Sequence, residues 1–183
     1  YFYECNPKEQ TTDSFDRIKL FFKKYPNFYY FLIKYISPVY SNQRSLSDFL
    51  ETVDGIVLNI GSGNSPRQTG ILNVDILDYD NVDIICDIHS LPFEDESIDA
   101  VLNIAVLEHV KSPQLVLNEI YRVLKPGGKV FSVIPFMQPF HASPNDFQRY
   151  TLPGIEFLHY DFEKVDSGVY AGPVSGALWV MQE

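Results

Sequence analysis

The chain has 183 residues, 45% of them apolar, which suits one globular domain with a sizeable core and argues against disorder along the whole chain. The net charge of −10 is uneven: residues 1–44 hold seven Lys/Arg against four Asp/Glu, and residues 45–183 hold seven against twenty. Such an acidic domain is a poor partner for nucleic acid, and no apolar run is long enough for a membrane-spanning helix.

Residues 1–44 form a basic segment that contains 13 of the 27 aromatic residues. Residues 14–40 predict one or two helices broken near Pro26. Basic and aromatic residues together suit peripheral contact with a membrane surface, or a lid over a substrate site. The plainer interpretation is a helical arm packed on its own domain or on a second copy in a homodimer. We therefore divide the chain into an N-terminal arm, 1–44, and a main domain, 45–183.

The two cysteines, Cys5 and Cys86, have no metal-ligand spacing, and we expect no metal site. Cys86 falls in a predicted buried strand and is interpreted as a small core residue. A reducing, cytoplasmic setting fits this cysteine content. Because the chain starts at Tyr1 rather than Met, we expect that a segment upstream was removed.

The main domain alternates strand and helix patterns, as in βαβ units. A helix over 45–53 leads to strands expected at 56–60, 71–75, 82–86, 98–103 and 129–134. Apolar residues at helical spacing predict a helix over 113–124, which Lys125-Pro126-Gly127-Gly128 ends. The first crossover has only about ten residues, Pro66 and Gly70 among them, which is too short for a full helix. Past Pro135 we expect a loop, a short helix after Thr151, a strand near 162–170 and the start of a helix at 174–182.

Glycines and carboxylates follow three successive predicted strands. Gly61 and Gly63 follow the first, Asp75 ends the second and Asp87 ends the third. Open α/β folds bind nucleotide-like ligands at the carboxyl ends of parallel strands, which predicts a nucleoside-containing cofactor. An Asp in the position of Asp75 either binds a ribose diol or stabilises a turn. The glycine spacing and the early acid differ from the dinucleotide-binding pattern, so a ligand without pyrophosphate fits better.

An ordered set of motifs between Val57 and Val133 resembles the class I S-adenosylmethionine-dependent methyltransferases of the broad type 11 group. The matching pieces are Val57-Leu58-Asn59-Ile60-Gly61-Ser62-Gly63, Asn73-Val74-Asp75, Cys86-Asp87-Ile88-His89-Ser90-Leu91-Pro92-Phe93, Glu96-Ser97-Ile98-Asp99-Ala100-Val101, Val106-Leu107-Glu108-His109-Val110 and Arg122-Val123-Leu124-Lys125-Pro126-Gly127-Gly128-Lys129. The resemblance implies an α/β fold, Rossmann-like, with a mostly parallel sheet, flanking helices and S-adenosylmethionine as cofactor. Such enzymes normally end in an antiparallel hairpin, whose last strand is apparently missing here, so either the chain is truncated or a partner covers the edge.

The resemblance also implies roles for individual residues. The backbone at Gly61 and Gly63 would contact the methionine moiety, and Asp75 would bind the ribose hydroxyls. Asp87 would accept from the adenine amino group beside the Ile88 backbone. Two further residues at the end of the fourth strand would lie near the methionine amine or the sulfonium, namely Asn103 and Ile104.

This chain departs from the family pattern at two motif positions and in its first crossover. Asn59 stands where an acid is usual, and Ser65 stands where a third glycine is frequent. Asn59 still offers a carbonyl acceptor but no charge, which predicts lower cofactor affinity. The shortened crossover resembles a subset of these enzymes associated with bacterial surface-polysaccharide biosynthesis, an analogy of fold rather than of site.

Three residues are candidates for the general base that a hydroxyl acceptor would need: His109, His141 and Asp146. His109 instead holds the start of a helix in the plainer interpretation. His141 and Asp146 lie in a loop with Phe147, Arg149 and Tyr150 that suits a polar acceptor such as a sugar. The plainer interpretation of that loop is an internal Asp146–Arg149 ion pair.

The leading hypothesis from the sequence is methyl transfer to an oxygen of a small-molecule or glycan acceptor. One alternative is a lipid or quinone acceptor, with the aromatic arm at the membrane surface. Another is a catalytically inactive cofactor-binding protein that acts as a regulatory or assembly subunit, which the exchange at Asn59 favours.

Overall fold

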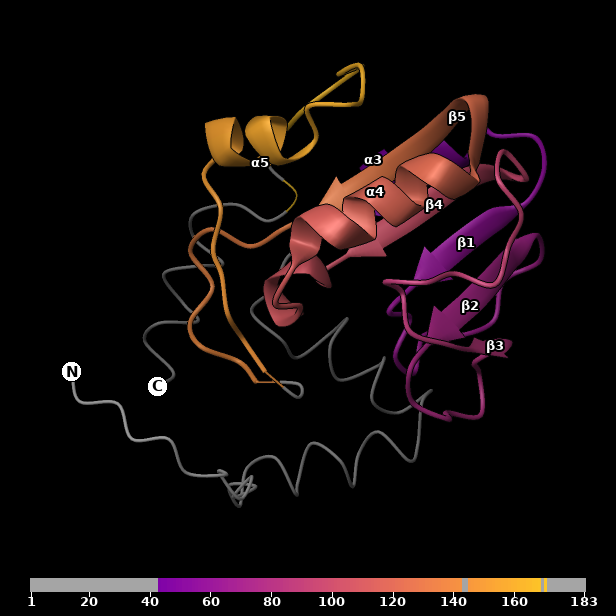
Figure 1. Cartoon of the computed structure of the whole chain (residues 1–183), viewed down its shortest axis with the longest axis horizontal. Coiled ribbons are helices and arrows are strands. Elements are labelled where there is room, and N and C mark those ends of the chain that lie inside the picture. Colours follow the sequence, from indigo (N-terminus) through magenta and orange to yellow (C-terminus); the bar gives the residue numbers. More distant parts are fainter. Residues whose placement is uncertain (1–42, 143–144, 169, 171–183) are drawn as a thin grey trace.

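A computed structural model describes residues 43–142, 145–168 and 170. Within these residues the strands form one five-stranded sheet in the order β3-β2-β1-β4-β5 (Figure 1). The strands are β1 (Val57–Ile60), β2 (Ile71–Asp75), β3 (Ile84–Ile85), β4 (Ile98–Ile104) and β5 (Leu124–Val133). Every neighbouring pair is parallel. The predicted Rossmann-like α/β fold is confirmed, and the chain reverses its direction of winding between β1 and β4.

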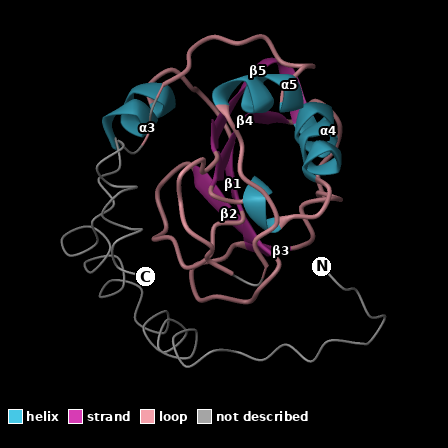
Figure 2. Cartoon of the chain, turned by 90° about the vertical axis from the view of Figure 1, so that its left-hand side faces the viewer, coloured by secondary structure: helices cyan, strands magenta, loops and turns pink. Residues whose placement is uncertain are grey.

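Helices cover both faces of the sheet, as Figure 2 shows with α3 (Gln43–Leu50) and α4 (Pro113–Val123) on opposite sides. Successive strand residues alternate between these faces. Leu58 and Val101 belong to the larger apolar cluster with α4, whereas Val57 and Ala100 belong to the smaller one with Phe49 and other residues of α3. The central strands β1 and β4 are therefore buried on both sides, as in other parallel sheets.

The segment that follows α4 shows why its glycines are needed. The helix ends at Val123 and β5 begins at Leu124, but the pairing of β5 with β4 shifts between Ile98 and Ala100. Gly127 has a φ of 80°, and a Cβ on Gly128 would lie 2.8 Å from the carbonyl oxygen of Lys125. The predicted helix stop is therefore a tight irregular turn at the start of the last strand.

The first crossover, between Ile60 and Ile71, contains turns and no helix, as its length predicted. The short helix expected after Thr151 is α5 (Leu152–Leu158), where the Thr151 side chain accepts a hydrogen bond from the backbone N–H of Gly154. The 3-10 helix η1 (Leu107–His109) connects β4 to α4 through a short loop. None of the described helices is long and apolar enough to cross a membrane.

The strand expected near 162–170 is wrong for the residues that can be inspected there. Residues 162–168 and 170 are irregular and Val165 is 91% exposed, so the apolar alternation of this segment does not lead to pairing with the described sheet. The third strand is also shorter than expected. Three other expectations lie outside the described residues: the helices over 14–40, the helix over 174–182 and the missing final strand.

Candidate cofactor and acceptor site

The glycine loop after β1 is fastened to the end of β2. The backbone N–H of Gly63 donates to Asp75 Oδ2 at 2.7 Å, and the N–H of Ser62 donates to the Val74 carbonyl. Gly61 and Gly63 have φ values of 58° and 54°, and a Cβ on Gly61 would lie 2.7 Å from Val106. Among the described residues, a Cβ on Gly63 would meet nothing within 4 Å, which leaves room for a ligand beside this backbone.

Asp75 is 8% exposed and combines the two roles expected for it. Its Oδ1 accepts from the backbone N–H of Leu77 at 2.9 Å, which is a turn-stabilising contact, while Oδ2 holds Gly63. Each carboxylate oxygen has a second lone pair that can accept from a ribose hydroxyl. The turn and the ligand-binding interpretation are therefore compatible in this geometry.

The family's usual acid is replaced by Asn59, and the structure supplies a reason. Asn73, 2% exposed, donates through Nδ2 to the carbonyls of Ser65 and Asn81, which leaves its Oδ1 facing Asn59. Asn59 Nδ2 donates to that oxygen at 3.0 Å. An ionised Asp at position 59 would place a second acceptor against Asn73 Oδ1, whereas Asn supplies the donor that the oxygen requires.

The end of β3 carries the residues expected beside the adenine. Asp87 is exposed, and its Oδ1 accepts from the backbone N–H and from Nδ1 of His89 at 2.9 and 2.7 Å. These hydrogen bonds lower the pKa of Asp87, so the carboxylate is ionised at neutral pH and available as an acceptor. Ile88 is 8% exposed and packs in the main core, which fixes the backbone at this point.

Arg122 of α4 holds the loop that follows Asp87. Its guanidinium donates to Glu119, to the carbonyls of Leu91 and Phe93, and to Asp95. The hydrogen bonds to Glu119 and Asp95 raise the arginine's pKa above its usual value. Two family motifs that are distant in sequence are thus joined by one side chain.

Asn103 lies at the end of β4, where the methionine end of the cofactor is expected. It is fully buried, its Nδ2 donates to Ser132 Oγ at 3.4 Å, and its Oδ1 has no hydrogen-bond partner among the described residues. A buried acceptor without a partner costs free energy unless a ligand supplies a donor, and an ammonium group is such a donor. Ile104 is half-buried and belongs to the smaller apolar cluster.

Glu108 and two histidines converge beyond β4, although sequence reasoning did not single out the glutamate. His109 Nε2 and His141 Nε2 each lie 3.8 Å from Glu108 Oε1, and the two imidazole rings are 4.9 Å apart in a T-shaped arrangement. Glu108 is fully buried. The only sequence signal for it was its place in the Leu107-Glu108-His109 motif, which does not reveal that a distant loop brings His141 to it.

Asp146 does not fit the expected role of general base. Its carboxylate forms a bidentate ion pair with Arg149 and accepts a hydrogen bond from the backbone N–H of His141 at 2.8 Å. The hydrogen bonds from Arg149, more than any other cause, lower the pKa of Asp146 to about 2. So weak a base cannot take a proton efficiently at neutral pH. The contacts of Asp146 with Arg149 and with the His141 backbone favour the loop-ordering interpretation of this pair.

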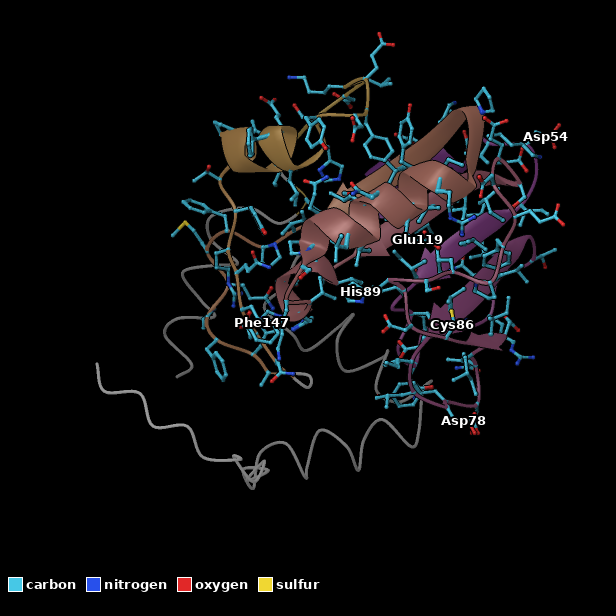
Figure 3. The ribbon with its side chains drawn as sticks, viewed as in Figure 1. Asp54, Asp78, Cys86, His89, Glu119 and Phe147 are labelled. Carbon is cyan, nitrogen blue, oxygen red and sulfur yellow. The ribbon has the colours of Figure 1, made fainter. Side chains whose placement is uncertain are left out.

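The loop after β5 is anchored across the carboxyl edge of the sheet. The N–H of Phe147 donates to the Glu108 carbonyl at 2.8 Å, and Gln148 Nε2 donates to the Val110 carbonyl at 2.9 Å. Figure 3 shows Phe147 beyond the carboxyl ends of the strands and Asp54 at the opposite end of the sheet. A shallow pocket over this loop is lined by Gln138, Phe140, Asp146, Phe147, Gln148 and Arg149.

A second pocket lies at the amino end of the strands, lined by residues 52–54, 99 and 125–129. None of the expected cofactor or acceptor residues is in it. We therefore assign the site to the carboxyl edge, where the glycine loop, both carboxylates, Asn103 and the histidines lie.

A parallel sheet in the order β3-β2-β1-β4-β5, with a glycine loop after β1 and carboxylates after β2 and β3, defines the class I S-adenosylmethionine-dependent methyltransferase fold. Residues 67–132 match a family described as a methyltransferase domain, of type 11. The resemblance found in the sequence is thereby confirmed, and the domain and fold imply S-adenosylmethionine as the cofactor. The backbone at Gly63 and Asn103 Oδ1, which has no hydrogen-bond partner in the described part of the chain, fit that molecule.

The curated relatives that the chain resembles include enzymes of quinone biosynthesis. A demethylmenaquinone methyltransferase of Renibacterium salmoninarum is 37% identical over 55% of this chain and 49% of its own length. A ubiquinone/menaquinone biosynthesis C-methyltransferase, UbiE, of Desulfotalea psychrophila is 47% identical over 25% of this chain and 18% of its own length. The chain thus spans about half, or less, of the length of these relatives.

Among solved structures, a methyltransferase of Thermotoga maritima, described as a possible histamine N-methyltransferase, is similar with a TM-score of 0.56. It is 18% identical, with 76% of this chain and 78% of that chain covered. A protein of Pyrococcus horikoshii gives a TM-score of 0.51 at 22% identity, with 72% and 84% covered. Identities this low establish the fold and nothing about the acceptor.

Proposed function

We propose that this protein is an S-adenosylmethionine-dependent methyltransferase that acts on an oxygen of a small acceptor of glycan type. The observation that carries the proposal is the clustering of the cofactor-type residues at one sheet edge, with Gly63 and Asp75 joined by a hydrogen bond of 2.7 Å. The matched methyltransferase domain supports the same reading.

In this proposal the ends of β1, β2, β3 and β4 each contribute a contact to the cofactor. Asp75 accepts from the ribose hydroxyls, Asp87 from the adenine amino group, and Asn103 Oδ1 from the ammonium group. The backbone at Gly61 and Gly63 faces the methionine moiety. When bound, S-adenosylmethionine supplies a methyl group on a sulfonium, which needs no further activation by the protein. The chain's own task is then to orient the acceptor, exclude water and remove a proton.

The acceptor side would be built from the loop after β5 and from η1. The Asp146–Arg149 pair orders this loop, whose polar groups and aromatic rings suit a sugar, since rings stack on its apolar face while polar groups fix its hydroxyls. Because Asp146 is paired with Arg149, we assign the acceptor's proton to His109 and His141 in this proposal. A cytoplasmic role in polysaccharide biosynthesis is the setting that this proposal retains from the sequence.

One specific observation favours a quinone or lipid acceptor as a second candidate. The segment from Phe136 to Phe147 presents large apolar side chains to solvent: Phe136 is 60% exposed, Met137 57%, Phe140 71% and Phe147 44%. Such a group of exposed apolar residues suits an apolar ligand or surface. The names of the two curated relatives, which refer to ubiquinone/menaquinone biosynthesis and to demethylmenaquinone, point in the same direction.

A catalytically inactive cofactor-binding role is the weaker alternative. Its main support in the sequence was the uncharged Asn59, and the hydrogen bond from Asn59 to Asn73 gives that exchange a structural reason instead.

Calorimetric titration with S-adenosylhomocysteine, with NAD as the control ligand, tests the proposal first. Saturable binding of the former alone supports the cofactor assignment, and its absence in a folded sample contradicts it. Turnover is then screened with nucleotide sugars and glycans beside quinone analogues. Product from the quinones alone replaces the leading acceptor class, and co-sedimentation with vesicles at low salt distinguishes action at a membrane. Binding without turnover on any acceptor favours the inactive role.

A further inference from the structure

Glu108 is a buried acid without a conventional partner. Its side chain is 0% exposed, and neither Oε1 nor Oε2 has a hydrogen-bond partner among the residues that the structure describes. Removing an ionised carboxylate from water costs several kcal/mol unless a cation or several donors compensate it. Something must therefore offset this charge when Glu108 is ionised.

Two imidazole nitrogens lie close to Glu108. His109 Nε2 and His141 Nε2 each lie 3.8 Å from its Oε1, which is beyond hydrogen-bond range. The guanidinium of Arg149 is committed to Asp146, which raises the arginine's pKa more than the distant charge of Glu108 does. The two imidazole nitrogens therefore lie near the Glu108 carboxylate but at distances too long for a hydrogen bond.

Hydrogen bonds on the far side of each ring determine what these nitrogens present. His109 Nδ1 contacts the Asn145 carbonyl, which can only accept, so Nδ1 carries the proton. His141 Nδ1 lies 3.1 Å from the Pro139 carbonyl and requires a proton for the same reason. It also lies 3.3 Å from Arg149 Nη2, but that group's two hydrogens point to the Pro139 carbonyl and to Asp146.

Neutral rings with protonated Nδ1 atoms direct both Nε2 lone pairs toward the carboxylate. A carboxylate and two imidazole lone pairs repel one another unless a positive charge lies between them, either a metal ion or a proton on one ring. An Nδ1–H donated to a backbone carbonyl is also the usual second contact of a metal-bound histidine, because it fixes both the tautomer and the ring.

We propose that Glu108, His109 and His141 bind a divalent transition-metal ion. One ligand atom from each residue lies within 4.8 Å of the others. Ligands at about 2.1 Å around a tetrahedral ion are separated by roughly 3.4 Å. The two 3.8 Å separations from Glu108 Oε1 need to shorten only slightly, whereas the set as a whole extends to 4.8 Å, so the two histidine rings must move closer together on binding. Two imidazoles and one carboxylate are typical of zinc and non-haem iron sites and leave coordination positions open.

The metal site lies at the carboxyl edge of the sheet, on the side proposed for the acceptor. Its role in catalysis therefore rests on the proposed function, whereas the binding of the metal ion does not. A cation there makes His109 and His141 ligands rather than bases. It favours the deprotonated form of an acceptor hydroxyl, whose proton passes to solvent. Metal binding itself does not depend on methyl transfer and is measured without cofactor or acceptor.

The test is a titration of the purified, metal-stripped protein with Co²⁺, followed by its visible absorption. We expect one Co²⁺ per chain with the intense bands of a low-symmetry nitrogen and oxygen site. Zn²⁺ should displace the ion, and excess Mg²⁺ should not, because nitrogen ligands disfavour magnesium. Binding that Mg²⁺ abolishes, or no binding, overturns the proposal.

Variants separate this site from other histidine–carboxylate pairs on the chain. Glu108→Gln keeps the side-chain shape and should weaken Co²⁺ binding at least about tenfold, as should His141→Ala. The control is His89→Ala, which removes the exposed pair of His89 with Asp87 and should leave the Co²⁺ stoichiometry unchanged. If Glu108→Gln does not fold, the Co²⁺ affinity of His141→Ala tests the proposal instead. Unchanged binding in a folded ligand variant contradicts the proposal, and failure of S-adenosylhomocysteine binding does not affect it.

Discussion

Gly63 and Asp75, which lie 12 positions apart in the chain, are joined by a hydrogen bond of 2.7 Å from the glycine N–H to the carboxylate. The acid expected to bind the cofactor's ribose therefore also positions the loop expected to contact its methionine end. Any substitution of Asp75 acts on both, which makes this residue the sharpest test of the cofactor assignment.

Asp75→Ala should lower the affinity for S-adenosylhomocysteine about 100-fold or more. The substitution removes two charge-assisted hydrogen bonds to the ribose, each contributing roughly 1.5 kcal/mol, and releases the loop as well. Asp75→Asn retains one acceptor oxygen, so its affinity for S-adenosylhomocysteine should lie between those of the unchanged protein and of Asp75→Ala. Calorimetry gives the affinities, and Asp78→Ala is the matched control, because Asp78 is an exposed acid on the same loop. Equal losses in both alanine variants would contradict the assignment.

Asn59→Asp should destabilise the fold by about 1–3 kcal/mol, even though Asp is usual at this position in the resembling family. Asn73 Oδ1 needs the donor that Asn59 Nδ2 supplies at 3.0 Å, and a carboxylate would repel it. Urea denaturation measures the change in the free energy of unfolding. Asn118→Asp is the control, since Asn118 Oδ1 accepts from Gln114 and an Asp oxygen can do the same. A stability equal to that of the control would show that the polar contact with Asn73 contributes nothing.

The parts of this fold that the sequence predicts well are those governed by local pattern. The apolar runs that became β1, β2 and β4 are each bounded by a loop or an acid, and α4 begins at Pro113 and ends one residue before the expected position. The short first crossover follows from chain length alone. The strand expected near 162–170 fails because alternation in the sequence does not decide whether a segment pairs with a sheet, and the described residues there stay unpaired although β5 is an edge strand of the described sheet.

Arg122→Lys should destabilise the protein by about 2 kcal/mol and weaken S-adenosylhomocysteine binding as well. A lysine keeps the charge but cannot reach Glu119, Asp95 and the two loop carbonyls at once. The loop that carries Asp87 and Ile88 would then be less ordered. Arg67→Lys is the control, because Arg67 is 59% exposed in its side chain and its contacts are 3.4 Å long. We expect a change within about 0.5 kcal/mol there. Similar losses of stability in both variants would contradict the inference that Arg122 orders the loop after Asp87.

The residues that sequence reasoning missed depend on contacts between distant segments. Glu108 is a candidate site residue because the loop that carries His141 lies against η1, and no local sequence pattern predicts that contact. The same applies to His159, which α5 brings to Ser132 on β5. Asp146 was overestimated as a base for a related reason, because the orientation of Arg149 decides its ionisation. Pattern identifies candidate residues, whereas the tertiary contacts decide their protonation and role.

His159 should make the stability of the protein depend on pH below neutrality. Its Nδ1 donates to the Ile155 carbonyl and its Nε2 accepts from Ser132 Oγ at 2.8 Å. Burial lowers its pKa below the ordinary value of 6.5. The unfolded chain therefore takes up a proton at a higher pH than the folded protein does. The resulting contribution to stability is fully present above pH 6.5 and is lost as pH falls from 6.5 through the lowered folded-state pKa.

His159→Gln removes this titration. The free energy of unfolding of this variant should therefore decline less between pH 7 and pH 5 than that of the unchanged protein, by about 1.4 kcal/mol for each unit by which the pKa is lowered. Urea denaturation at a series of pH values measures both curves, which should run parallel between pH 7 and pH 8. Curves that also stay parallel below pH 6.5 would show that the His159 ring titrates alike in the folded and unfolded chain.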